Sequence, residues 1–318
     1  MSPLASPAAV ALAFLVGLCS GSFLNVLIHR LPRMLERGWR ESALEILLHQ
    51  ARLPDAARAL QAWSDSAGDS APLRDPETHA PAYNLAVPRS ACPACGHRIG
   101  ALENVPLVSW LVLRGRCRAC GTSIAVRYPV VELIGGILAA LAIYRFGVTV
   151  AGLGACILLW SLVALTFIDF DRQLLPDDIT LPILWLGLFV HLVLAYAGTE
   201  RPFGVAVDLA DAVTGAMAGY LALWTVYWLF RLLRGKEGMG FGDFKLLAAL
   251  GAWLGWQLLL PIILLSSVVG AAIGLTLIVF RGRDHSVPLA FGPYLAIAGG
   301  IALFYGPQLI ALQQGLVR

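Results

Sequence analysis

Charged residues are scarce in this sequence: Asp, Glu, Lys and Arg make up only 14% of its 318 residues, whereas 58% are hydrophobic. The apolar residues gather in long runs rich in Leu and Ala. This composition excludes a soluble two-domain enzyme and predicts an all-α polytopic membrane protein. The net charge of +3 says little by itself, but the distribution of the basic residues orients the chain in the membrane.

The sequence also lacks any Lys or Arg before its first apolar run, residues 5–28, while Arg30 and Arg33 follow that run at once. A cleaved signal peptide would have a basic start and a shorter apolar core. We therefore expect a retained transmembrane helix with the N-terminus outside. Ser22 and Asn25, near its inner end, are explained at least as well by hydrogen bonds to a neighbouring helix as by contact with a substrate.

Two further patterns are missing from the chain. No internal or inverted repeat is visible, which argues against a carrier built from repeated halves. No Gly-rich turn between a strand and a helix is visible either, so the nucleotide-binding domain of a soluble methyltransferase is not expected.

Seven more apolar runs predict seven more membrane helices. They cover residues 128–146, 150–169, 179–197, 207–230, 244–256, 258–280 and 289–312. With both termini outside, 20 of the 23 basic residues fall on the cytoplasmic side of the membrane and 3 on the outer side, which strongly favours this topology. The run 244–256 is too short to cross alone, because a span needs about 20 residues, so we expect it to be broken or packed inside the bundle.

These patterns divide the chain into three parts. Residues 1–30 form the first membrane helix, residues 31–127 a cytoplasmic insertion, and residues 128–318 a membrane domain of seven helices. All 13 basic residues from Arg30 to Arg127 are arginines, which fits a cytoplasmic position for the insertion.

Within the insertion, two segments have helical spacing. Glu41–Gln50 and Asp55–Trp63 are separated by Pro54, which predicts a helical hairpin or a helix lying on the membrane surface. Ser64 to Pro88 is rich in Ala, Asp, Ser and Pro and is predicted to be a loop.

Four cysteines in the insertion have the spacing of a metal site. Each of two Cys-x-x-Cys pairs precedes a glycine that permits a tight turn; the cysteines are Cys92, Cys95, Cys117 and Cys120. Four thiolates leave no open position on zinc, so a structural zinc-ribbon-like site is expected. Disulfides are the alternative, but a cytoplasmic loop keeps thiols reduced. His97 is not expected to bind, and Cys19 and Cys156, which lie in apolar runs, are expected to be ordinary buried residues.

Two acids at the ends of apolar runs are candidates for catalysis. Asp169 closes the run before Phe170-Asp171, and Asp243 lies in Gly240-Phe241-Gly242-Asp243-Phe244-Lys245. An ionisable residue at the edge of the hydrocarbon region is costly and favours a functional site, although headgroup water could also solvate it. Two carboxylates brought together share a proton, so that one serves as acid and the other as base, as in an aspartyl protease. Gly240 and Gly242 would let a substrate backbone approach.

Other charged residues nearby have alternative roles. Asp171 competes with Asp169 for the catalytic position. Asp177 and Asp178 are expected to cap the next helix, and Lys245 is expected to extend to the headgroups rather than to hold a carboxylate.

The motifs together resemble the type IV prepilin peptidases. The matching segments are Gly21-Ser22-Phe23-Leu24-Asn25-Val26 with Arg30-Leu31-Pro32, the paired Cys-x-x-Cys, Ile168-Asp169 with Leu174-Leu175-Pro176-Asp177, Gly240 to Lys245, and Phe291-Gly292-Pro293. The resemblance implies an aspartyl endopeptidase of the bacterial inner membrane that uses Asp169 and Asp243 at the cytoplasmic face. It also implies prepilin and pseudopilin substrates with a basic leader, and S-adenosylmethionine for methylation of the new N-terminus.

Acids on the same face are expected to meet the basic residues of the leader; they are Asp171, Asp177, Asp178 and Glu237. No nucleic-acid partner is expected. The alternative function is a membrane transporter or assembly scaffold, with the acids as an ion relay and the zinc-binding insertion as a docking module.

Overall fold

A computed structural model describes residues 5–49, 83–198, 202–236, 238–281 and 290–316. Helices dominate these residues, and apart from two isolated β-bridges they contain no strand. The long helices are α1 (Pro7–His49), α4 (Arg127–Phe146), α5 (Val150–Arg172), α6 (Asp177–Tyr196), α7 (Leu209–Arg234), α8 (Phe241–Leu254), α9 (Leu259–Arg281) and α10 (Gly292–Leu316). Short helices are η1 (Leu102–Asn104), α3 (Val108–Val112) and η2 (Trp256–Leu258).

The predicted fold class is confirmed. Each of the eight apolar runs coincides with one of the long helices. Within the described residues, seven helices are long and apolar enough to cross a membrane, and α8 is not among them. The chain is therefore an all-α polytopic membrane protein.

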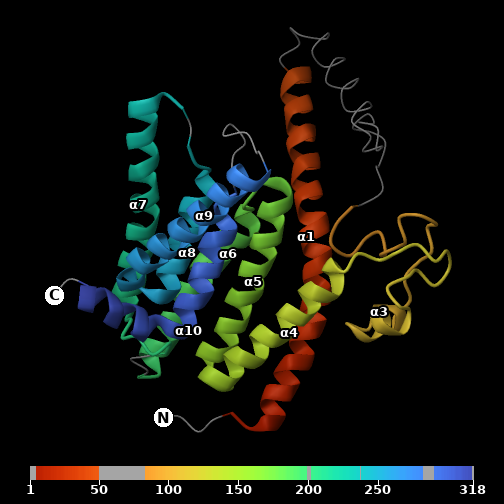
Figure 1. Ribbon diagram of the computed structural model, residues 1–318, viewed down its shortest axis with the longest axis horizontal. Coiled ribbons are helices and arrows are strands. Elements are labelled where there is room, and N and C mark those ends of the chain that lie inside the picture. The colour runs from red at the N-terminus through yellow and green to blue at the C-terminus, as the bar shows by residue number, and fades with distance from the viewer. Residues whose placement is uncertain (1–4, 50–82, 199–201, 237, 282–289, 317–318) are drawn as a thin grey trace.

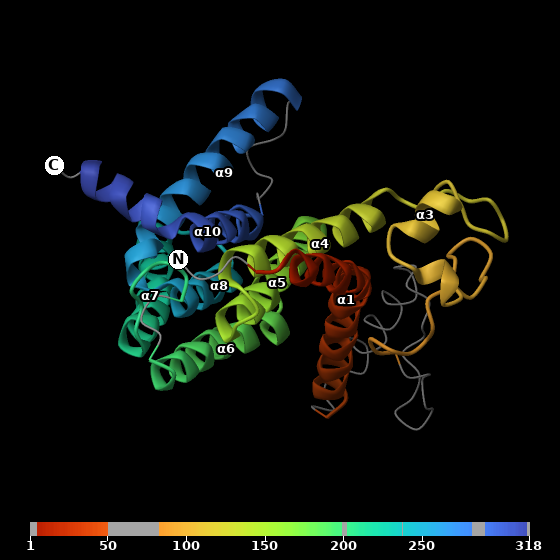
Figure 2. The same ribbon diagram turned by 90° about the horizontal axis from the view of Figure 1, so that it is seen from below.

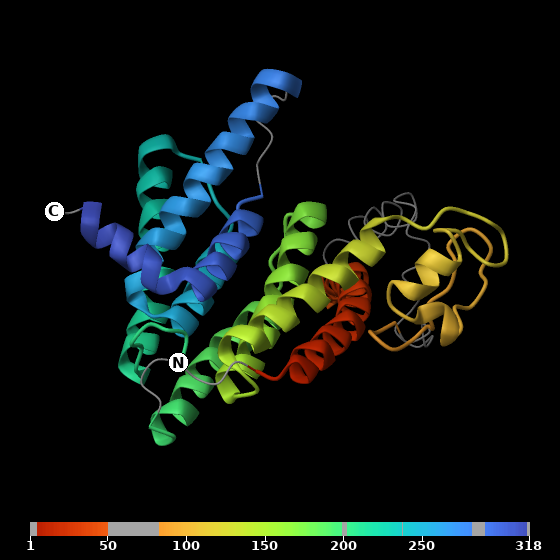
Figure 3. The same ribbon diagram turned by 60° about the horizontal axis from the view of Figure 1, so that its bottom comes forward.

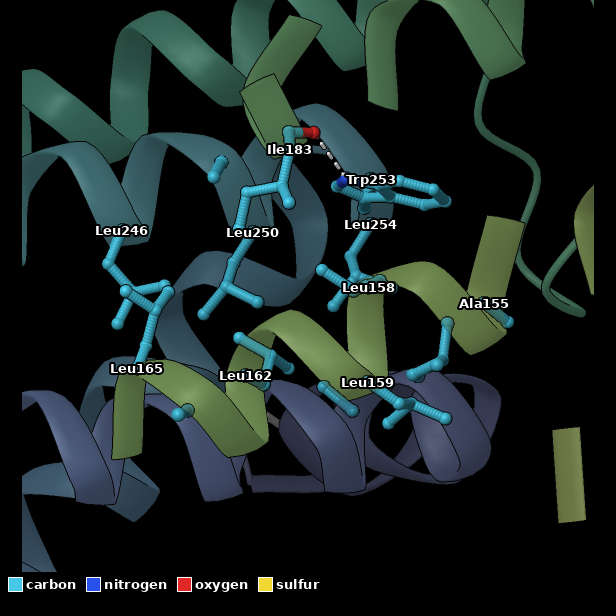
Figure 4. Packing of buried hydrophobic residues seen from close by; sticks show 14 of the residues in the cluster. Ala155, Leu158, Leu159, Leu162, Leu165, Ile183, Leu246, Leu250, Trp253 and Leu254 are labelled. Atoms are coloured by element: carbon cyan, nitrogen blue, oxygen red, sulfur yellow. Dashed lines mark hydrogen bonds between the residues drawn. The ribbon is translucent and has the colours of Figure 1, made fainter. Parts of the chain in front are cut away.

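Helix α8 is short because it is packed inside the bundle, as predicted. Phe244 and the residues from Leu246 to Leu254 are buried, and Trp253 is fully enclosed. The Trp253 indole donates to the carbonyl oxygen of Ile183 in α6 at 2.7 Å (Figure 4). Against α7, a Cβ on Gly219 would lie 2.6 Å from the Leu247 carbonyl oxygen, so the two backbones touch directly. This packing fixes α8, and with it the acid near its start.

Helix α1 differs from the prediction. It continues through Pro32 to His49, so the segment that begins at Glu41 extends α1 and is not part of a separate hairpin. At 43 residues the helix is about 65 Å long, roughly twice the hydrocarbon thickness. The proposed second helix, Asp55–Trp63, and the loop up to residue 82 lie outside the described residues.

The last part of the predicted loop packs back against α1. Arg30 is 8% exposed and donates to the carbonyl oxygens of Asn84 and Pro88 at 2.9 and 2.6 Å. The segment containing α3 lies on one side of α1, and helices α5 to α10 lie on the other side (Figure 1). Helix α4 packs against α1 and leads into the bundle (Figure 2). The sequence insertion is therefore attached at one edge of the membrane domain.

Candidate active site and metal centre

Asp169 lies in the last turn of α5. The helix ends because Gln173 adopts a left-handed conformation, with φ of 51°, and donates its backbone N–H to the Asp169 carbonyl oxygen at 2.9 Å. The Asp169 carboxylate lies directly against the backbone of Gly292, the first residue of α10, because a Cβ there would lie 2.6 Å from Asp169 Oδ2. The end of α5 and the start of α10 thus meet at this carboxylate.

Asp243 lies in the first turn of α8. Gly240 is the N-cap, and Asp243 is the third helical residue after it. Its carboxylate lies near the Gly240 backbone, since a Cβ on Gly240 would lie 3.9 Å from Asp243 Oδ2. The Gly-x-x-Asp spacing therefore both starts the helix and turns the carboxylate back toward the chain that precedes it.

The structure brings the two acids together. Asp169 and Asp243 are 5% and 6% exposed and both line one cavity of about 620 Å³. They are close enough for the charge of Asp169 to act on Asp243. Among the described residues, the buried Oδ1 atom of Asp243 has no hydrogen-bond partner. Two adjacent buried carboxylates with a free acceptor can share a proton and act on a water and a substrate.

Three glycines lie near the acids, and they differ in how much room a side chain would have at each position. A Cβ on Gly292 would lie 2.6 Å from Asp169 Oδ2, and a Cβ on Gly242 would lie 2.7 Å from the Leu175 Cβ. A Cβ on Gly240 would meet only Asp243 Oδ2, at 3.9 Å. Gly240 and Gly242 both line the cavity, but Gly242 is required first by its packing against Leu175.

The competing acids have partners outside the cavity. Asp171 forms an ion pair with Arg127 at 2.7 Å, and Asp177 forms one with Lys245 at 2.7 Å. The expectation that Lys245 only extends to the headgroups is therefore wrong. The expected cap is also wrong in detail, because Pro176 is the N-cap of α6 and Asp177 and Asp178 occupy its first turn. There they interact favourably with the helix dipole.

Asn25 and Ser22 both lie against a neighbouring helix. Asn25 donates to the Tyr128 carbonyl oxygen of α4 at 3.0 Å, and Ser22 lies close to Glu132 of the same helix. These contacts give both polar residues of α1 a role in packing.

The four predicted metal ligands form one cluster. The sulfur atoms of Cys92, Cys95, Cys117 and Cys120 all lie within 4.8 Å of one another. The Cys92–Cys120 and Cys95–Cys117 sulfur separations are 3.8 and 4.0 Å. A tetrahedral zinc ion with Zn–S bonds of about 2.3 Å needs sulfurs about 3.8 Å apart, so the cluster fits this ion. All four cysteines are free thiols, not disulfides.

The backbone around the cysteines forms two matching turns. Gly96 and Gly121 have φ of 71° and 72° and donate their N–H groups to the carbonyl oxygens of Cys92 and Cys117, each at 2.9 Å. Such left-handed turns favour glycine, which explains the glycine after each pair. The Cys120 thiol donates to the Thr122 hydroxyl at 3.2 Å, which orients this sulfur within the cluster.

His97 lies outside the cysteine cluster and pairs with an acid. Its Nε2 atom lies 3.0 Å from Glu103 Oε2. The backbone N–H of Gly100 and then His97 lower the pKa of Glu103, which keeps this residue a carboxylate. His97 therefore links the first cysteine turn to η1.

Sequence reasoning missed several cavity residues. Gly292 belongs to a motif that was recognised, but its contact with Asp169 was not. Three small residues of α9 also line the cavity, namely Ser267, Gly270 and Ala271. Only their recurrence on one face of an apolar helix could have drawn attention to them.

Comparison with known proteins covers most of the chain. Residues 15–146 match the bacterial peptidase A24 N-terminal domain, and residues 156–275 match the type IV leader peptidase family. The chain is 52% identical to a prepilin leader peptidase/N-methyltransferase of Aeromonas hydrophila over 94% of this chain and 91% of the relative. Similar proteins of the same name occur in Pseudomonas putida, at 48% identity over 97% and 94%, and in Pseudomonas aeruginosa, at 47% over 93% and 90%. No solved structure gave a significant match.

Proposed function

This chain belongs to the type IV leader peptidase family, and from that premise we propose that it removes the leader peptide from prepilins and methylates the new N-terminus. It is a multi-pass protein of the bacterial inner membrane. The observation that carries the peptidase activity is the buried pair Asp169 and Asp243 in one cavity. The matches do not favour the transporter or scaffold alternative.

In the proposed reaction, the two carboxylates share one proton. The ionised carboxylate takes a proton from a water, whose oxygen attacks the carbonyl carbon of the scissile peptide bond. The protonated carboxyl group gives its proton to the leaving amine nitrogen as the C–N bond breaks. Asp169 is packed against the backbone of Gly292 and Asp243 lies near that of Gly240, so both groups are positioned before the substrate arrives.

We place this site at the cytoplasmic face and both termini in the periplasm. The end of α5 that carries Asp169 also carries Arg172, and α7 ends in Arg231 and Arg234 shortly before Asp243. Basic residues concentrate on the cytoplasmic side of membrane helices. A prepilin cut at this face would leave its apolar helix in the bilayer.

The cofactors have separate roles. Zinc bound by the four clustered cysteines would stabilise the insertion and leave no position for a catalytic water. S-adenosylmethionine would supply the methyl group of the second reaction. Because the described residues form no strand, it does not bind in the Gly-rich turn of a soluble methyltransferase fold.

The substrates we propose are prepilins and pseudopilins, which reach the site from the lipid bilayer, and no nucleic acid takes part. Substitution of each acid by its amide tests the assignment, because a carboxylate pair that exchanges a proton fails when either member loses its acid. The purified protein is incubated with a prepilin, with and without S-adenosylmethionine, and the product mass is measured. Asp169→Asn and Asp243→Asn should abolish cleavage, whereas the matched control Asp171→Asn should retain it. Near-normal cleavage by either of the first two variants would refute the pair.

A further inference from the structure

We infer that the start of the prepilin's apolar helix docks on α9, along a stripe of small residues formed by Ser267, Gly270 and Ala271, which we call the α9 stripe. The inference rests on the proposed peptidase function and adds where the substrate lies. It makes the α9 stripe a determinant of substrate selection.

The α9 stripe belongs to the same cavity as the acids. Its three residues line that cavity together with Asp169 and Asp243. Asp243 is 6% exposed, and among the described residues its Oδ1 atom lacks a hydrogen-bond partner. A buried acceptor of this kind requires a partner, which a bound substrate or water would supply. The cavity volume of about 620 Å³ is in the range of sites that enclose a ligand.

Helix α9 is buried in the bundle at its start and exposed at its end. Leu259 and Ile262 near its start are 6% and 1% exposed, whereas Val279 and Phe280 near its end are 65% and 82% exposed. Figures 2 and 3 show its far end standing away from α7 and α8. The substrate helix that follows the cut bond must leave the cavity within the bilayer, and the divergence of α9 provides a lateral route.

Two adjacent rows of small residues run along α9, and only one of them is covered. Ser266 is fully buried, and Gly270 of the α9 stripe is covered by α10, since a Cβ on Gly270 would lie 3.2 Å from the Tyr294 ring. The exposed part of the α9 stripe is the neighbouring row, Ser267 and Ala271. Two small residues four apart let a second membrane helix approach closely, because the backbones can touch.

A lipid chain does not account for this surface. Other exposed positions of α9 carry large apolar side chains, among them Leu264 at 55% and Val268 at 66% exposure, as expected for a face toward lipid. Small side chains at Ser267 and Ala271 gain nothing against fluid acyl chains but permit close contact with a helix. We therefore assign the exposed row to the apolar helix of the substrate.

Adjacent alanines provide a matched kinetic test. Ala271 lines the cavity, whereas Ala272 is exposed and is not among the lining residues. Ala271→Leu should lower kcat/KM for a full-length prepilin at least tenfold, mostly through KM, and Ala272→Leu should leave it unchanged. Equal kcat/KM for the two variants would overturn the inference.

Cross-linking gives a readout that does not depend on turnover. In the Asp243→Asn background, Ser267→Cys should form a disulfide with a cysteine placed early in the prepilin's apolar helix, and Val268→Cys should not. Equal yields at both positions, or no cross-link to prepilin at Ser267→Cys, would overturn the docking. If instead the unsubstituted protein fails to cleave prepilin at all, the proposed function fails before the α9 stripe is tested.

Discussion

Gly292 lies so close to Asp169 that a single added carbon would collide with the carboxylate: a Cβ on Gly292 would come within 2.6 Å of Asp169 Oδ2. The absence of a side chain at Gly292 therefore allows the start of α10 to pack against the acid and fix its position. The contact joins helices that are far apart in the sequence.

We predict that Gly292→Ala slows prepilin cleavage by about 10- to 100-fold, because a displacement of about 1 Å at a catalytic group costs this much. The variant should still insert into the membrane, since the collision is local. Initial rates of leader removal at saturating prepilin would measure the effect.

Gly300→Ala is the matched control for this substitution. It lies in the same helix, and a Cβ there would meet only Leu159 Cδ2, at an ordinary 3.7 Å. Its cleavage rate should be unchanged. If both variants cleave at the normal rate, Gly292 does not position Asp169.

The second prediction concerns the cysteine cluster. The purified protein should contain one zinc ion per chain, and Cys92→Ser should lose it, because the four sulfurs have the separations of a closed tetrahedral site. Removal of zinc by a chelator should expose the insertion to protease before it slows peptide cleavage. Elemental analysis and limited proteolysis measure the two effects.

Cys156→Ser is the control for the zinc measurement, because Cys156 is buried in the membrane domain and remote in sequence from the cluster. It should retain full zinc content. Metal-free protein with an intact, protease-resistant insertion would contradict a structural zinc site.

Local sequence patterns were sufficient to predict those parts of the structure that depend on residues close together in the chain. The spacing of the two Cys-x-x-Cys-Gly turns predicted the cluster, since each turn brings its own two sulfurs together. The length of the run 244–256 predicted a buried short helix, because α8 cannot cross a bilayer alone.

Contacts between distant helices were not predictable in this way. The pair Lys245–Asp177 depends on how α8 packs against α6, and no local pattern fixes that distance. Likewise, Pro32 does not end α1, because buried Ile28 and Leu31 before it and partly buried Leu35 after it hold the helix through tertiary packing. The catalytic pair itself was chosen by chemistry and resemblance, and its shared cavity became visible only in three dimensions.

The third prediction separates the two glycines before Asp243. Gly242→Ala should destabilise the protein by about 1–3 kcal/mol, because its Cβ would lie 2.7 Å from Leu175 Cβ in packed surroundings. Gly240→Ala has room and a φ of −79°, which alanine adopts easily, so its melting temperature should stay the same. Any rise in KM for Gly240→Ala then reports the approach of the substrate backbone. An unchanged KM would mean that Gly240 is not a substrate contact.

The final prediction concerns recognition of the basic leader. Of the four acids expected to attract it, Asp171 and Asp177 form ion pairs with Arg127 and Lys245, and Glu237 lies outside the described residues. Asp178 is exposed and has no ion pair among the described residues. We therefore expect Asp178 to contribute most of the attraction among the described acids.

Asp178→Asn should raise KM about two- to fivefold at low salt, in keeping with the free energy of about 0.2–1 kcal/mol of an exposed charge pair. The effect should vanish above roughly 0.5 M salt, because ions then screen charges over a few ångströms. A leader whose basic residues are replaced by neutral ones should show the same rise with the unsubstituted protein and no further rise with Asp178→Asn. If the two changes add fully at low salt, Asp178 and the leader's charges act independently, and the proposed attraction is wrong.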